Sequence, residues 1–166
     1  MAKRSLSTTN ITPTATADAA ALVDNTYQGA ILGASATQKT NILEVQLGGI
    51  AAASSPSIML LARDSTVAGT LVIGSTFDAA LDAATAALAA PAVVGNSATV
   101  DPQRSATLHL LNLTFNAFGG IVRWVAAPGE EISIVGLAAS LGEVSLSAFT
   151  GGTPGAMGSH IIYETL

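Results

Sequence analysis

The sequence predicts a single all-β domain, built as a β-sandwich of jelly-roll type, and three observations lead to this prediction. The chain has 166 residues, the size of one ordinary domain with one core. From about Asn41 onward, apolar and polar residues alternate with a period of two, as they do in strands with one buried face. Gly, Pro and Ser interrupt these stretches at short intervals, which is typical of the turns of a β-sandwich. We expect this domain to occupy residues 28–166.

Residues 1–27 are expected to form an extended arm outside the domain. This segment is rich in Ser, Thr and Ala, and its few large apolar side chains include Ile11, Leu22 and Tyr27. They are too few to build a core, so the segment is either a loose tail or an arm that lies on a neighbouring subunit. We favour the arm, because contact with a partner can bury these three side chains and add strand hydrogen bonds.

The clearest strand pattern lies early in the domain. Leu43, Val45 and Leu47 are expected on one face of a strand, with Glu44 and Gln46 between them. Among the later strands, the one at residues 143–148 alternates Val, Leu and Ala on one face with Glu and Ser on the other. These later strands are expected over residues 57–62, 66–73, 107–115 and 143–148.

The stretch between residues 121 and 135 predicts a hairpin. Ile121–Ala126 and Glu131–Val135 both have the composition of strands. Pro128 and Gly129 suit the two central positions of a type II turn between them. Gly129 is therefore expected to have a positive φ, which a residue without a Cβ adopts at little cost.

One segment does not fit the β pattern. Residues 77–90 are rich in Ala and contain two Leu residues seven positions apart. Thr76 or Asp78 could cap the start of a helix here, and Pro91 disfavours helix at the residue before it. We therefore expect one short helix or helical loop near residues 77–90, inserted between strands.

Charged residues are scarce. Six Lys and Arg and eleven Asp and Glu make up 10% of the chain, against about 25% in a typical soluble protein. Hydrophobic residues make up 49%, and the mean hydropathy is +0.53. Such a surface suits a subunit whose faces are buried in contacts with other subunits. The net charge of −5, without a basic cluster, argues against a nucleic-acid partner. No uncharged apolar stretch is long enough to predict a membrane span.

No set of residues predicts catalysis or a cofactor. The two histidines, His109 and His160, lack the spaced carboxylate or Cys partners of a zinc site, and the chain has no Cys. Neither a Gly-x-Ser-x-Gly elbow nor a phosphate-binding loop is present. We therefore expect no enzyme activity, no cofactor and no metal.

Four side chains are candidates for structural or interface roles. Arg63 and Asp64 are either ion-paired anchors at the end of a strand or solvated surface charges. Arg123 and Trp124 are adjacent in a predicted strand, so they point to opposite faces. Trp124 is then expected in the core, and Arg123 outside or in an interface.

Three stretches of the chain carry a resemblance. They are NLTFNAFGGIVRWVAAPGEEISIVG at residues 112–136, with its apolar–Pro–Gly–Glu turn, ARDSTV at residues 62–67, and the C-terminal GGTPGAMGSHIIYE. Together they resemble small structural proteins of tailed-phage virions, of the capsid decoration (cement) type. The resemblance implies a homotrimer that binds a major capsid protein or another virion subunit, and binds neither nucleic acid nor a membrane. It also implies a place on the capsid surface of the virion, after synthesis in the host cytoplasm.

Other classes of protein stay open from the sequence. A phage tail or head-fibre component and a non-viral, self-assembling surface-layer subunit share the low charge and the β pattern. A cupin-like ligand-binding domain is a weaker alternative, because it needs several His and acidic residues that converge inside a barrel, and this chain has few of them.

Overall fold

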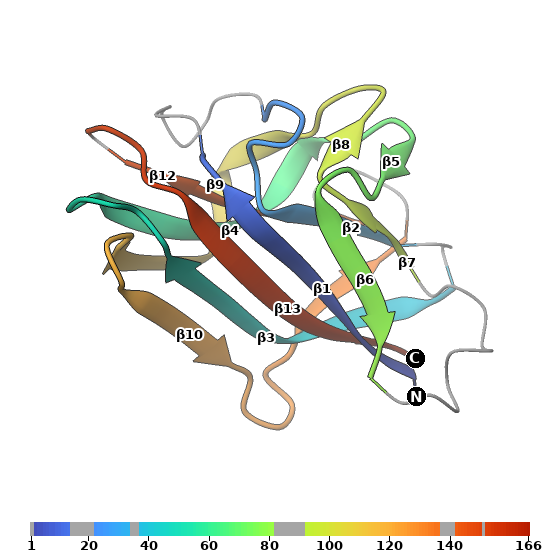
Figure 1. The fold of residues 1–166 in the computed structure, drawn as a ribbon. Coiled ribbons are helices and arrows are strands. Elements are labelled where there is room, and N and C mark those ends of the chain that lie inside the picture. Colours follow the sequence, from blue (N-terminus) through green and yellow to red (C-terminus); the bar gives the residue numbers. More distant parts are fainter. Residues whose placement is uncertain (1, 14–21, 34–36, 82–91, 137–141, 151) are drawn as a thin grey trace.

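The computed structural model describes residues 2–13, 22–33, 37–81, 92–136, 142–150 and 152–166. These residues form antiparallel strands and no helix, so the prediction of an all-β protein is confirmed. Two large sheets face each other, and the two ends of the chain lie close together at one end of the molecule (Figure 1).

The strands fall into three sheets. The largest has the order β10-β3-β13-β1-β6, and β11 also pairs with β3. Its members are β1 (Ala2–Ile11), β3 (Lys39–Gly49), β6 (Thr76–Ala80), β10 (Ile121–Val125), β11 (Ile132–Val135) and β13 (Met157–Thr165). The second has the order β7-β2-β12-β4-β9. Its members are β2 (Gly29–Gly33), β4 (Pro56–Thr66), β7 (Ala92–Gly95), β9 (Gln103–Asn116) and β12 (Glu143–Phe149). The third pairs β5 (Leu71–Val72) with β8 (Ser97–Ala98).

The main core lies between the two large sheets. Val45 on β3 and Ile161 on β13 meet Leu61 on β4 and Leu146 on β12 in one cluster of fully buried side chains. These residues alternate along their strands with residues that face the other way, as a period of two requires. Burial of each such side chain contributes about 1.5–3 kcal/mol to folding.

A smaller apolar cluster covers the outer face of the five-stranded sheet. Ala30 on β2 lies in this cluster, whereas its neighbour Ile31 lies in the main core, so the two clusters are on opposite faces of the strand. Its other buried members are Leu22, Tyr27 and Ala68 from loops and Leu71 from β5. Because this cluster covers the outer face of the sheet, both faces of β12 are buried, and six of its seven residues are buried.

The structure contradicts the arm predicted for the start of the chain. Residues 2–11 form β1, which pairs with β13 on one side and with β6 on the other. Leu6 is 1% exposed and belongs to the main core, and Ile11, Leu22 and Tyr27 are buried within the same chain. The boundary expected at residue 27 is therefore wrong. A central strand needs few large apolar residues of its own, because its neighbours supply most of the core.

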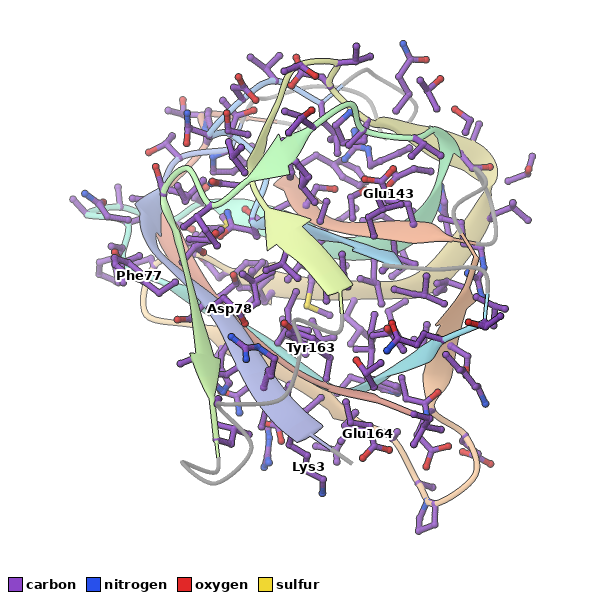
Figure 2. All side chains as sticks on the ribbon, turned by 90° about the vertical axis from the view of Figure 1, so that its right-hand side faces the viewer. Lys3, Phe77, Asp78, Glu143, Tyr163 and Glu164 are labelled. Atoms are coloured by element: carbon purple, nitrogen blue, oxygen red, sulfur yellow. The ribbon has the colours of Figure 1, made fainter. Side chains whose placement is uncertain are left out.

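The helix predicted near residues 77–90 is also wrong where the structure describes it. Thr76–Ala80 is strand β6, paired with β1 from Thr76 opposite Thr8 to Ala80 opposite Arg4. In Figure 2, Phe77 lies on the outside and Asp78 beside β1. Pairing with β1 overrides the helical preference of the Ala residues. Residues 82–91 lie outside the described residues.

The turn at Pro128 and Gly129 is confirmed, but the hairpin is not. The Ala127 carbonyl accepts a hydrogen bond from the Glu130 N–H at 2.9 Å, and Gly129 has a φ of +87°. However, β10 and β11 do not pair with each other. Both pair with the same edge of β3, one after the other. The turn therefore lies in a loop that interrupts one edge strand.

The structure also differs from some of the strand predictions in detail. The pairing of β13 with β3 is irregular between Ile162 and Tyr163, and Leu43 is the extra residue on β3. Ile42, and not Leu43, therefore joins Val45 and Leu47 in the core. The strand expected to end before Arg63 continues to residue 66, and the strand expected over residues 66–73 is reduced to β5.

Replacement of Gly129 by Ala should lower the free energy of unfolding by about 1–2 kcal/mol, because a Cβ is unfavourable at positive φ. Gly48→Ala is the matched control: a Cβ at either position meets no atom within 4 Å, but only Gly129 has a positive φ. Urea unfolding of the two variants measures the change in the free energy of unfolding for each substitution. Equal effects of the two substitutions would contradict the turn.

Candidate interaction surface

One end of the sandwich carries no formal charge. It consists of the loops that follow β3 (residues 50–55), β9 (117–120) and β12 (150 and 152–156), at the left of Figure 1. No Lys, Arg, Asp or Glu occurs in residues 45–62, 105–122 or 144–163, which include these loops and the strand ends that carry them. We call this surface the uncharged loop end. The net charge of −5 comes entirely from the rest of the chain.

Close backbone contacts hold the three loops together. The N–H groups of Ile50 and Ala51 donate to the carbonyls of Ala156 at 2.8 Å and Ala117 at 2.9 Å. A Cβ at Gly49 would lie 2.0 Å from the Ala117 carbonyl oxygen, so only glycine permits this approach.

The Asn116 side chain joins two of the loops. Its Oδ1 accepts from the N–H groups of Ser55 and Phe118, both at 2.9 Å, and its Nδ2 donates to Ser54 Oγ at 2.9 Å. Loops fixed in this way lose little conformational entropy when a partner binds.

Three large apolar side chains stand exposed at this end. Ile50 and Phe118 are each 59% exposed, and Ile121, at the start of β10, is 69% exposed. Shallow hollows of about 360 and 310 Å³ lie between the loops that follow β3 and β12. A third, of about 270 Å³, lies beside Phe115 and Phe149. The residues that line these hollows are all uncharged, so the uncharged loop end is suited to contact with an apolar or weakly polar surface of another protein.

The outer face of the six-stranded sheet is partly polar. Arg123 on β10 forms an ion pair with Glu44 on β3, with Nε 2.8 Å from Oε1 and Nη2 3.0 Å from Oε2. The hydrogen bond from Arg123 lowers the pKa of Glu44. Beside this pair is a groove of about 480 Å³, which runs from Leu81 across Ile162 to Pro128. Lys3 and Glu164 lie at the lower end of the same sheet (Figure 2).

A group of polar side chains is buried on the covered face of the five-stranded sheet. Asp64 on β4 and Glu143 on β12 are fully buried. Ser145 Oγ donates to Asp64 Oδ1, and the Ala68 N–H donates to Glu143 Oε2, both at 2.7 Å. The second oxygen of each carboxyl and the Tyr27 hydroxyl have no hydrogen-bond partner among the described residues. Figure 2 shows Glu143 inside the molecule.

Burial raises the pKa of these carboxyls, to about 8 for Asp64 and about 7 for Glu143. The Ser145 hydroxyl, and Arg104 opposite Asp64 on β9, lower the pKa of Asp64 but do not offset burial. Since the group is enclosed by the fold, we assign it a structural role. Sequence reasoning missed it because the alternation along β12 places Glu143 away from the main core without showing that the other face is covered.

The candidate residues from the sequence are thus separated. Arg63 Nη2 donates to the Ser133 carbonyl at 2.8 Å and joins β4 to β11, while Asp64 points the other way and is buried. Trp124 packs against the main core, half-buried, and Arg123 faces out. No candidate from the sequence lies in the uncharged loop end, because its signal is an absence of charge and not a motif.

Comparison with family models, curated proteins and solved structures finds no match. In the part of the chain that the structure describes, no three His, Cys, Asp or Glu side chains are placed to hold a metal ion. None of the described residues belongs to a helix that could span a membrane.

Proposed function

We propose that this protein is a structural subunit of a virion, of the capsid decoration type, and that it acts by packing and not by catalysis. In this proposal the uncharged loop end packs against a neighbouring subunit, either another copy or a major capsid protein. A homotrimer on the capsid surface is the arrangement that the resemblance implies. The jelly-roll connectivity expected from the sequence stays part of this proposal.

The observation that carries the proposal is the combination found at the uncharged loop end. Ile50 and Phe118 are exposed on loops that hydrogen bonds already hold in place, Ile121 is exposed at the start of β10, and no charge lies among them. Contact through this end removes apolar surface from water and desolvates no charged group. The remaining surface is acidic and favours solubility.

Phe118→Asp should weaken self-association or attachment to particles by about 2–4 kcal/mol, because the contact must then bury a charge. Val100→Asp is the matched control, since Val100 is 54% exposed outside the uncharged loop end. Sedimentation velocity measures self-association, and co-sedimentation with purified virions measures attachment. A wild-type protein that stays a monomer of 16.5 kDa and does not attach would contradict the proposed function.

A further inference from the structure

The groove on the outer face of the six-stranded sheet is a second candidate surface, separate from the uncharged loop end. Its volume is about 480 Å³, and it runs from Leu81, just after β6, to Pro128, just after β10. β6 and β10 are at opposite ends of the strand order, so the groove crosses five strands. At about 4.8 Å between neighbouring strands its length is roughly 19 Å, which matches about six residues of extended chain.

The floor of the groove is apolar because of the irregularity in β3. Leu43 is the extra residue at this bulge and is turned out of the core, where it lines the groove with Ile162 of β13. Val125 and Leu81 line the same groove and are 52% and 50% exposed. Bulges often redirect a side chain beside a functional site. Four apolar side chains from separate segments therefore meet on a face that is open to solvent.

The charged residues of the groove leave it acidic. Its charged lining residues are Lys3, Glu44, Glu131 and Glu164. Glu44 is already paired with Arg123, and Lys3 lies opposite Glu164 on the neighbouring strand (Figure 2). Glu131 forms no ion pair in the part of the chain that the structure describes. Its Oε1 accepts from the Gly129 N–H at 3.0 Å, which favours the ionised carboxylate. A negative charge therefore remains at the Pro128 end.

We propose that this groove binds an extended segment of a partner protein, which places apolar side chains on the floor and a Lys or Arg beside Glu131. Apolar side chains on one side of such a segment cover Leu43 and Ile162, and the basic side chain complements the charge that the fold leaves unpaired. Repulsion by Glu131 disfavours an acidic segment. The net charge of −5 also speeds the approach of a basic partner. This contact does not depend on the one proposed for the uncharged loop end.

Two synthetic peptides test the chemistry of the partner. The first has eight residues in which Leu and Lys alternate, and the second has Glu in place of each Lys. In fluorescence anisotropy, the Lys peptide should bind at least about tenfold more tightly than the Glu peptide. Its binding should shift the NMR methyl signals of Leu43, Leu81 and Ile162. Spermine, a cation without apolar side chains, should not displace it.

Two charge reversals at adjacent residues test the position of the basic side chain. Glu131→Lys should weaken binding of the Lys peptide by about tenfold, because repulsion replaces attraction in the groove. Glu130→Lys is the matched control, since it changes the net charge equally at an exposed residue that does not line the groove. Leu81→Ser, at a half-exposed position, should also weaken binding, because it removes an apolar contact without a change of charge.

Equal binding of the two peptides would overturn this inference, as would equal losses in Glu131→Lys and Glu130→Lys. Displacement by spermine, or methyl signals that do not shift, would overturn it as well, because the peptide would then be held by charge alone or at another surface. Phe118→Asp should leave binding of the Lys peptide unchanged. A failure at the groove therefore leaves the proposed function standing, and a monomer that attaches to no virion leaves the groove proposal standing.

Discussion

Deletion of residues 2–11 should abolish the folded state. These residues are the whole of β1, which lies between β13 and β6 and contributes Leu6 to the core. Arg4 also forms an ion pair with Asp78, with Nη2 2.6 Å from Oδ2, and the Tyr163 hydroxyl donates to the same carboxylate at 2.9 Å. Loss of a central strand should exceed the total stability of a domain, about 5–15 kcal/mol. Circular dichroism and thermal unfolding would show no cooperative transition.

Two substitutions within β1 separate loss of the core from loss of the segment. Leu6→Ala should destabilise by about 2–5 kcal/mol, because it leaves a cavity. Ser7→Ala, on the opposite face of β1, should change the stability by less than about 0.5 kcal/mol. A truncated protein with an unchanged melting temperature would restore the arm interpretation.

Alkaline pH should destabilise the protein through Asp64 and Glu143. Their pKa values in the folded state are raised to about 8 and about 7, whereas ordinary carboxyl pKa values lie near 4. Above about pH 4 the folded state therefore binds more protons than the unfolded state. The stability that these groups contribute is complete below that pH and is lost as the pH rises through about 7 and 8. The loss should be several kcal/mol, because each unit of pKa shift corresponds to about 1.4 kcal/mol.

Neutral substitutions test this origin of the pH dependence. Asp64→Asn and Glu143→Gln keep an oxygen that can accept from Ser145 Oγ and from the Ala68 N–H. Each should flatten the decline of the melting temperature between about pH 5 and pH 9. Glu130→Gln, at an exposed carboxyl, should not. If the variant that carries both Asp64→Asn and Glu143→Gln shows the same decline of the melting temperature as the wild type, other groups cause the decline.

Features that depend only on residues close together in the sequence could be predicted from it. The alternation at Val45 and Leu47 placed both in the core, because a strand has a side-chain period of two wherever it pairs. The turn at Pro128 and Gly129 was predicted for the same kind of reason, since its dihedral angles are set by Pro and by the absence of a Cβ. From the sequence, only the scarcity of charged residues was evident, and their absence from one end of the fold was not.

Strand neighbours were decided by the tertiary structure alone. Nothing near β1 shows that it pairs with β13 at the other end of the chain, or that Thr76–Ala80 gains more from pairing with β1 than from a helix. The same holds for β10 and β11, which the turn suggested would pair with each other and which instead share one edge of β3. The burial of Asp64 and Glu143 depends on a cover from distant loops. By itself the sequence determined several of the strands, such as β3 and β12, and the local turn at Pro128 and Gly129. The order of the strands depends on hydrogen bonds and shared burial between distant segments, which no local pattern records.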